Sequence, residues 1–204
     1  MQLVGSKNNL SVYGPKCWFV IHTLAGLYTK SLKNEFLDVL NIIKKTFPCE
    51  LCRQNMTSHL IKCPITENDF ENADTLLKWT CKFHNIVNKD KDKYNHIYYE
   101  CSYIPQVRNY YLDKKQRCSE ITDHFTFVLF GITKSSRDDI NRFIFLVSKF
   151  LYEPEKSKYN LFLNSNYYTS CNFKYIYTFY KTYTSKLLDS DRIKEYFSVV
   201  NCPI

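Results

Sequence analysis

Apolar side chains recur every three to four residues along most of this 204-residue chain, the spacing that gathers them on one face of an α-helix. The pattern is clearest between Lys33 and Phe47, where the repeated side chains are Phe36, Leu37, Leu40, Ile43 and Phe47. Glycine is scarce, with 4 residues, which disfavours turn-rich β-structure and glycine-rich phosphate-binding loops. The pattern therefore predicts an all-α protein.

The same spacing predicts where the other helices lie. They are expected over residues 17–30, 49–62, 72–88, 138–150, 173–187 and 192–199, with a short one ending near residue 111 and a further apolar segment at 125–132. Residues 1–13 are polar. We expect the ordered fold to begin at Gly14-Pro15, because Gly and Pro often mark the boundary of a regular element. Residues 153–160 are expected to form a polar break.

A pair of cysteines lies at the boundary between two predicted helices. Pro48 ends the helix before it, because the residue that precedes a proline avoids the α conformation. A proline also suits the first turn of the next helix, because its φ angle is fixed near the helical value. We therefore expect Cys49 at or near a helix N-terminus and Cys52 one turn further in. The unpaired N–H groups and the helix dipole there favour a thiolate and lower its pKa.

The helix predicted to end near residue 88 carries a stripe of distinctive polar side chains. Cys81, His84, Asn85 and Asn88 lie at i, i+3, i+4 and i+7, which is one helical face. A surface helix usually carries Lys and Glu on such a face, so the stripe indicates a binding site. A polar stripe that only meets solvent is the alternative.

The formal charge of +8 does not by itself indicate a nucleic-acid partner, because the lysines are scattered and alternate with acidic residues, as in Lys89–Lys93. We therefore expect no nucleic-acid partner. Residues 1–15 lack the apolar core of a signal peptide, and no apolar run approaches the length of a membrane span. We expect no membrane association and no secretion by the usual route.

Nine cysteines without a secretory signal indicate metal binding or redox catalysis. Three kinds of site fit Cys49-x-x-Cys52 together with Cys81-x-x-His84. A thioredoxin-like domain needs a strand before its cysteines, where an amphipathic helix is predicted here, so we exclude it. A structural zinc site of the Cys3His type has the right ligands, but 28 residues separate the two pairs. The third is a helical flavoprotein whose dithiol passes electrons to a bound cofactor.

Three segments carry a resemblance to a known family. Trp18-x-x-x-His22, Phe47-Pro48-Cys49-x-x-Cys52 and Trp79-x-Cys81-x-x-His84-Asn85-x-Val87-Asn88 together resemble the Erv/ALR family of FAD-dependent sulfhydryl oxidases, in the family's order, over residues 13–111. The resemblance implies a four-helix bundle with a short fifth helix, FAD at the mouth of the bundle, and a homodimer. Residues 1–111 would form this domain, followed by a mostly helical C-terminal region at 112–204.

The resemblance also implies roles for individual residues. Cys52 would be the sulfur next to the flavin, and Cys49 the exposed sulfur that exchanges with substrate. Cys81 and Cys101 would form a structural disulfide, and no metal would be bound. The implied cofactor contacts are Trp18, His22, Tyr28, His84, Asn85, Val87, Asn88 and Lys93. The gap between Cys81 and Cys101 is longer than in the family, and a tyrosine follows Lys93 where proline is common, which weakens the assignment of Lys93.

The implied mechanism is thiol–disulfide exchange followed by flavin reduction. A thiolate of a protein substrate attacks Cys49 in the Cys49–Cys52 disulfide, and a second substrate thiol resolves the mixed disulfide. Electrons then pass from Cys52 to FAD, and molecular oxygen reoxidises the flavin and gives hydrogen peroxide. The substrates would be a thioredoxin-like carrier or virion proteins.

The C-terminal region contains a faint echo of the N-terminal one. Thr29-Lys30-Ser31 and the helix ending in Phe47 resemble Thr133-Lys134-Ser135 and the helix ending in Phe150, but the second copy lacks the cysteine pair. Either the region is a degenerate repeat, or two amphipathic helices are alike by chance.

The composition, rich in Asn, Lys and Tyr, resembles that of large cytoplasmic DNA viruses. This likeness implies a viral late protein in the host cytoplasm or the virion, with the mitochondrial intermembrane space as the alternative location. Among the other cysteines, Cys17 is expected to fill the core. Cys202 is either a shuttle thiol or idle, and the sequence assigns no role to Cys63, Cys118 or Cys171.

Overall fold

The computed structural model describes residues 7–91, 101, 117–165, 167, 169 and 171–183 of the chain. Every regular element within these ranges is a helix, which confirms the predicted all-α class. The α-helices are α1 (Lys7–Gly26), α2 (Lys33–Thr46), α3 (Glu50–Lys62), α4 (Ala73–Lys91), α6 (Arg117–Gly131), α7 (Arg137–Ser148), α8 (Glu155–Asn164) and α9 (Asn172–Tyr183), and the short 3-10 helices are η1 (Lys30–Leu32) and η2 (Glu67–Phe70). The implied fifth helix of the family domain lies outside the described residues.

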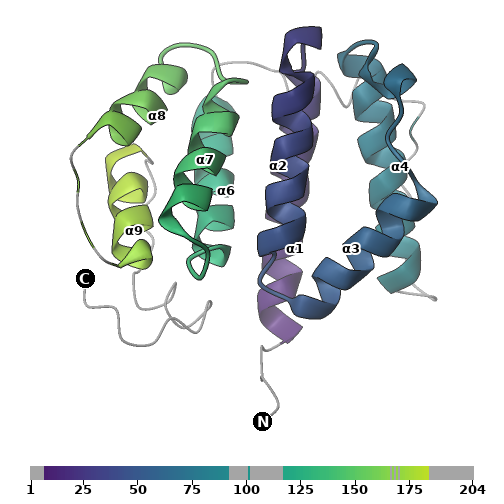
Figure 1. The fold of residues 1–204 in the computed structure, drawn as a ribbon, viewed down its shortest axis with the longest axis horizontal. Coiled ribbons are helices and arrows are strands. Elements are labelled where there is room, and N and C mark those ends of the chain that lie inside the picture. Colours follow the sequence, from purple (N-terminus) through teal and green to yellow (C-terminus); the bar gives the residue numbers. More distant parts are fainter. Residues whose placement is uncertain are drawn as a thin grey trace.

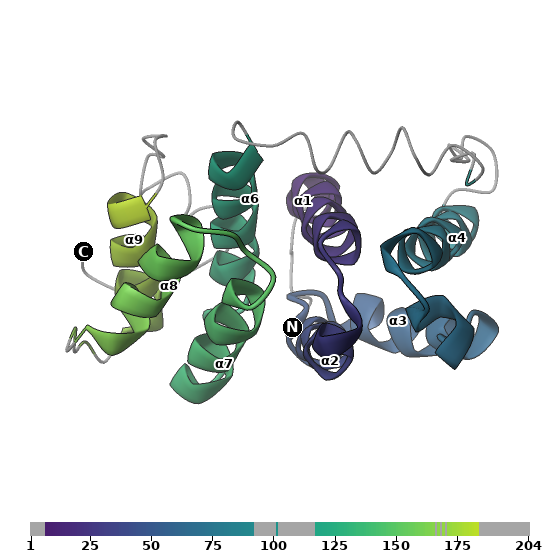
Figure 2. The same cartoon turned by 90° about the horizontal axis from the view of Figure 1, so that it is seen from above.

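The helices form two layers of four (Figure 1, Figure 2). One layer runs α9, α6, α1, α4, and the other runs α8, α7, α2, α3, so that each helix lies beside its neighbour in the row. The pairs α1–α6, α1–α4 and α6–α9 pack within the first layer, and α2–α7, α7–α8 and α2–α3 within the second. The α1–α2 pair is therefore covered on one side by α3 and α4 and on the other by α6 and α7.

The start of α3 matches the prediction made from the sequence. Cys49 is the N-cap residue, and its Sγ accepts a hydrogen bond from the backbone N–H of Cys52, 3.1 Å away. Pro48 precedes the cap and does not enter the first helical turn. The guanidinium of Arg53 donates to the carbonyl oxygen of Phe47, which fastens the approach to the helix. Both cysteines are thereby held at the positive end of the α3 dipole.

Two predictions about element boundaries are wrong, both because tertiary packing overrides local preference. The first helix begins at Lys7 and contains Pro15, although a proline inside a helix removes a backbone hydrogen bond. Tyr13 compensates, because it is 2% exposed and packs edge-on against Phe47 with ring centroids 4.9 Å apart. Residues 153–160 are not a break, because α8 begins at Glu155.

The error at α8 has a simple cause. The first turn of that helix is polar. The whole helix buries two side chains, Tyr159 and Phe162, and two are too few to produce a clear helical pattern. The helices predicted over 138–150 and 173–187 correspond to α7 and α9. The short helix predicted over 192–199 lies outside the described residues.

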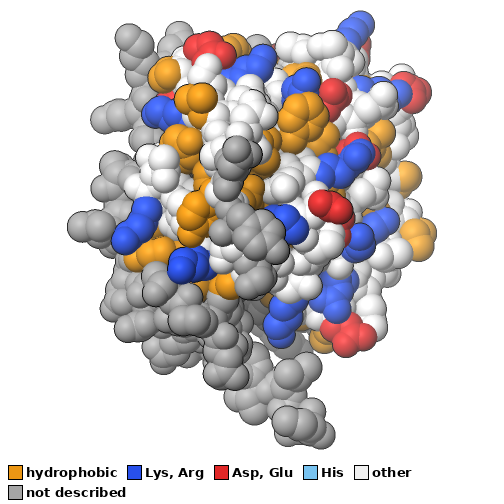
Figure 3. All heavy atoms as spheres, turned by 60° about the vertical axis from the view of Figure 1, so that its left-hand side comes forward, with side chains coloured by type: hydrophobic (Ala, Val, Ile, Leu, Met, Phe, Trp, Pro, Cys, Tyr) orange, Lys and Arg blue, Asp and Glu red, His pale blue; other side chains and the backbone are white. Residues whose placement is uncertain are grey.

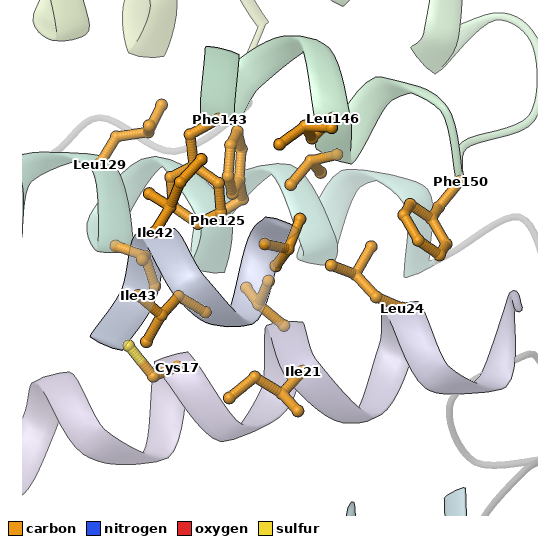
Figure 4. Packing of buried hydrophobic residues seen from close by; sticks show 14 of the residues in the cluster. Cys17, Ile21, Leu24, Ile42, Ile43, Phe125, Leu129, Phe143, Leu146 and Phe150 are labelled. Atoms are coloured by element: carbon orange, nitrogen blue, oxygen red, sulfur yellow. The ribbon is translucent and has the colours of Figure 1, made fainter. Parts of the chain in front are cut away.

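One hydrophobic core runs through the middle of the protein. Figure 4 shows Leu24 and Ile21 of α1 and Ile43 of α2 on the same cluster as Phe125 of α6 and Phe143 of α7. The core therefore joins the segment that resembles the family to the C-terminal helices. The expected boundary between residues 111 and 112 lies outside the described residues.

Two of the contacts between the N-terminal and C-terminal helices join residues at matching distances from landmarks in the sequence. Phe19 and His124 stand the same number of residues before the glycine that ends α1 and α6, and their rings lie 4.1 Å apart. Asp38 and Arg142 stand the same number of residues after Thr29 and Thr133, and they form an ion pair between α2 and α7. Contact between equivalent positions is the property of an interface with two-fold symmetry.

The charged side chains do not gather on the face drawn in Figure 3, where Lys and Arg are interspersed with Asp and Glu. The ion pairs of the protein include Lys33–Glu67 and Lys45–Asp139. In the part of the chain that the structure describes, no helix has the length and apolar character needed to cross a membrane.

Candidate active site

The Cys49 and Cys52 sulfurs are joined in a disulfide at the first turn of α3, with Cα atoms 5.1 Å apart. Both residues are partly buried, and Leu51 between them is 64% exposed. The pair therefore lies at the protein surface, where another protein chain can reach it. Both sulfurs belong to the end of the helix at which backbone N–H groups stabilise negative charge.

An apolar pocket opens on the inner side of this disulfide, between α1, α2, α3 and α4. It contains about 830 Å³ of empty space, counted out to its mouth. The lining residues are Gly14, Cys17, Trp18, Ile21, Ile43, Phe47, Cys52, Asn55, Met56, His59, Phe83 and Val87. Cys52 belongs to the lining and Cys49 does not. The two cysteines thus have different surroundings, because only Cys52 contributes to the pocket wall.

Aromatic rings from α1 and α4 stack beside the pocket. The indole of Trp18 lies on the imidazole of His84, with centroids 4.0 Å apart and planes inclined by 13°. It also stacks on His22 at 5.6 Å and meets the edge of Phe83 at 5.6 Å. Such a group of flat side chains suits a planar ring system as ligand.

The two histidines of this group are hydrogen-bonded to each other. His22 Nε2 lies 3.1 Å from His84 Nδ1, and His22 Nδ1 lies 2.9 Å from the hydroxyl oxygen of Thr80. His22 is 7% exposed, and burial lowers its pKa to about 4. His22 is therefore neutral at pH 7, and both of its ring nitrogens have hydrogen-bond partners in the core.

The lowered pKa of His22 predicts a pH dependence of stability. Between pH 6.5 and 4 the unfolded chain binds a proton at His22 that the folded chain does not, so the free energy of unfolding falls as the pH falls through this window. The loss across the whole window should be about 3 kcal/mol. Urea unfolding at pH 7 and pH 4.5 should therefore show a steeper loss for the wild type than for His22→Gln. Equal losses in the two proteins would contradict a neutral, buried His22.

A second disulfide joins Cys81 of α4 to Cys101. This is the pair that the resemblance implies, and it ties the chain after α4 back to the helix. Because Cys49, Cys52 and Cys81 are all in disulfides, their thiolates are not available as zinc ligands. Among the described residues, no group of three or more His, Cys, Asp or Glu side chains is placed to hold a metal ion. The zinc alternative gains no support.

Comparison with known proteins agrees with this geometry. The Erv1 / Alr family profile matches residues 15–111. Over 86 residues the chain is 36% identical to the FAD-linked sulfhydryl oxidase of African swine fever virus (isolate Pig/Kenya/KEN-50/1950), and the matched segment covers 40% of this chain and 69% of that protein. The chain belongs to the Erv1/Alr family.

Other relatives share the same segment. The chain is 32% identical over 87 residues to a probable FAD-linked sulfhydryl oxidase of Acanthamoeba polyphaga mimivirus. The matched segment covers 41% of this chain and 59% of that protein. It is 32% identical over 82 residues to the mitochondrial FAD-linked sulfhydryl oxidase of Saccharomyces cerevisiae, and this match covers 37% of this chain and 41% of that protein. No solved structure matches the chain.

The residues of the Erv1/Alr motifs are not all in the pocket. Trp18, Cys52 and Val87 line it. Asn85 donates from its amide to Cys101 Sγ, 3.4 Å away, and Asn88 is partly buried on the same helix.

Among the other expected cofactor contacts, Tyr28 does not line the pocket. Tyr28 donates its hydroxyl to the carbonyl oxygen of Phe70 at 3.0 Å, away from the pocket, and Lys93 lies outside the described residues. Their proposed contacts with FAD remain predictions.

The sequence interpretation missed several pocket residues. Asn55, Met56 and His59 line the pocket from α3, and their positions at i+3, i+4 and i+7 from Cys52 are the signal that places them on the same helical face. His59 is 5% exposed. Thr80 is not part of the pocket lining, but its contact with His22 was also missed, although Thr80 stands four residues before His84.

The remaining described cysteines are resolved in part. Cys17, expected as a core filler, is buried and not disulfide-bonded, and it also lines the pocket. Cys63 is a free, partly buried thiol, and burial raises its pKa. Cys171 is disulfide-bonded. Cys202 lies outside the described residues.

Proposed function

We propose that this member of the Erv1/Alr family is an FAD-linked sulfhydryl oxidase that forms disulfide bonds in protein thiol substrates. The observation that carries the proposal is the position of the Cys49–Cys52 disulfide, with Cys52 inside an apolar pocket and Cys49 outside it. A redox pair divided in this way can exchange with a substrate on one side and with a cofactor on the other. The relatives that share this segment are named as FAD-linked sulfhydryl oxidases.

The pocket fits the ring system of FAD. Its lining is mostly apolar, and Trp18 provides a flat surface at its wall. Trp18 and Val87 would hold the ring from opposite helices, and His84, Asn85 and Asn88 provide polar groups on the adjoining face of α4. Bound there, FAD supplies a two-electron acceptor next to Cys52.

The cysteines carry out the exchange with substrate. A substrate thiolate attacks Cys49 Sγ, the Cys49–Cys52 bond breaks, and Cys52 leaves as a thiolate. A second substrate thiolate attacks the substrate sulfur of the mixed disulfide, so that the substrate leaves as a disulfide and Cys49 becomes a thiolate. The N–H of Cys52, 3.1 Å from Cys49 Sγ, and the α3 dipole both favour that thiolate.

The dithiol then holds the two electrons taken from the substrate, and closing the Cys49–Cys52 bond again requires an acceptor beside Cys52. We propose molecular oxygen as the final acceptor, with hydrogen peroxide as its product. A thioredoxin-like carrier and virion proteins are the substrate classes that the sequence suggests. The viral relatives favour the host cytoplasm or the virion as the site of action, and the mitochondrial relative keeps the intermembrane space as the alternative.

The C-terminal region takes part in the fold as an internal partner of the oxidase unit. The helices α6 and α7 cover α1 and α2 through contacts between corresponding positions, as a second copy related by a two-fold axis would. In the second unit, Phe125 stacks on Tyr159, and Phe179 packs edge-on against Tyr159 in the core. We therefore propose that residues 112–204 are a degenerate repeat. Because α6 and α7 cover this face of α1 and α2, the expected homodimer would have to use another surface.

The proposal is tested by purifying the full-length protein. It should be yellow, release FAD on denaturation, and consume oxygen when it is given a dithiol, with one FAD per chain because residues 112–204 contain no tryptophan to take the place of Trp18. A colourless protein that neither binds added FAD nor consumes oxygen would overturn the proposed function.

A further inference from the structure

We propose that Thr80 is a positioning residue that fixes the tautomers of His22 and His84 and thereby decides which hydrogen-bonding group His84 presents beside the flavin pocket. This inference rests on the proposed function, because it gives His84 its role next to the cofactor. Thr80 itself is fully buried on α4 and does not belong to the pocket lining.

The direction of the hydrogen bonds follows from the Thr80 hydroxyl. Its oxygen lies 2.8 Å from the carbonyl oxygen of Leu77 and 2.9 Å from His22 Nδ1. Two oxygens at 2.8 Å in a dry site repel each other unless a hydrogen lies between them, and a carbonyl oxygen has none to give. The hydroxyl must therefore donate to Leu77. Its lone pair then faces His22 Nδ1, so that nitrogen must carry the hydrogen.

The direction passes on from His22 to His84. A neutral imidazole has one donor nitrogen and one acceptor nitrogen. Because Nδ1 of His22 is the donor, its Nε2 is the acceptor, and His84 Nδ1, 3.1 Å away, must donate to it. Neutral His84 then has its lone pair on Nε2. If these hydrogen bonds pointed in the opposite direction, neutral His84 would present an N–H at Nε2.

A hydroxyl that touches neither substrate nor cofactor thus controls whether His84 accepts or donates a hydrogen bond. Trp18, which lines the pocket, stacks on His84 and on His22 and holds both rings in the orientation that the chain of hydrogen bonds needs. A bound ligand that donates to His84 Nε2 would be favoured, and one that only accepts there would not.

Long-range proton–nitrogen NMR spectra of the histidine rings test this directly in the full-length protein, with and without FAD. At neutral pH both His22 and His84 should be Nδ1–H tautomers in the wild type. Thr80→Val keeps the shape of the side chain and removes the hydroxyl, and it should convert both rings to Nε2–H. Thr80→Ser should restore the wild-type spectrum.

The affinity for FAD provides a second measurement. Thr80→Val should bind FAD about tenfold more weakly, because His84 Nε2 would then present an N–H in place of a lone pair, and Thr80→Ser should recover most of that loss. An Nε2–H tautomer for His22 in the wild type would overturn the inference, as would unchanged tautomers in folded Thr80→Val. If Thr80→Val does not fold, the wild-type spectrum still decides. Failure of the wild type to bind FAD would overturn the proposed function while the tautomers remained measurable.

Discussion

Replacing Cys52 with serine should lower the turnover number for a dithiol substrate by about a thousandfold or more. A serine oxygen can neither form the internal disulfide nor carry electrons from Cys49 into the pocket. Cys49→Ser should have a loss of the same order, because the outer sulfur is the one that the substrate attacks. Both variants should keep FAD, since the other walls of the pocket remain. Oxygen consumption with dithiothreitol, measured per bound flavin, provides the comparison.

Two other cysteines serve as controls for this experiment. Cys63 is free, partly buried and absent from the pocket lining, so Cys63→Ser should leave turnover unchanged. Cys81 is bonded to Cys101 across a separation of 20 residues, and Cys81→Ser should lower the free energy of unfolding by about 3 kcal/mol. Its folded, flavin-loaded fraction should still turn over. If that fraction were as inactive as Cys52→Ser, the distinction between a catalytic and a structural disulfide would be wrong.

How much the sequence predicts depends on how local the cause is. The place of Cys49 at a helix start was predictable, because Pro48 and the two cysteines lie within a few residues and each has a strong local effect. The extension of α1 through Pro15 was not, because it depends on burying Tyr13 against residues far along the chain. Local preference and tertiary packing conflict at that point, and packing prevails.

The candidate site divides in the same way. The pocket residues Asn55 and His59 follow from helical spacing after Cys52 and could have been named. The bond between His22 and Thr80 joins residues on two helices, 58 positions apart, and no pattern in the sequence places them together. The Cys81–Cys101 pair was named from the family resemblance, because cysteine spacing alone leaves many pairings open.

Removing residues 112–204 should leave a protein that does not fold stably by itself. The deletion takes away α6 and α7, and the apolar side chains of α1 and α2 that pack on them, among them Tyr13 and Ile42, would face water. An exposed apolar face of this kind leads to aggregation or to association of two copies. The truncated protein should therefore be insoluble or molten, or form larger assemblies than the full chain does in light scattering.

A single substitution tests the same contact in the intact chain. A Cβ atom at Gly131 of α6 would overlap the ring of Tyr13 of α1 and lie 2.6 Å from its hydroxyl oxygen. Tyr13 is buried and donates to the carbonyl oxygen of Val128, so its ring has little room to move. Gly131→Ala should lower the free energy of unfolding by about 2 kcal/mol. Most of that loss should disappear when Tyr13→Leu is also present.

The two experiments together separate a repeat that completes the fold from an appended domain. In an appended domain, the clash between α6 and α1 would loosen the C-terminal helices while the oxidase unit kept its stability and its flavin. If the two units share one core, Gly131→Ala must lower the temperature at which FAD is released along with the temperature of global unfolding. A soluble, monomeric fragment of residues 1–111 with wild-type thermal stability would show that α1 and α2 need no internal partner.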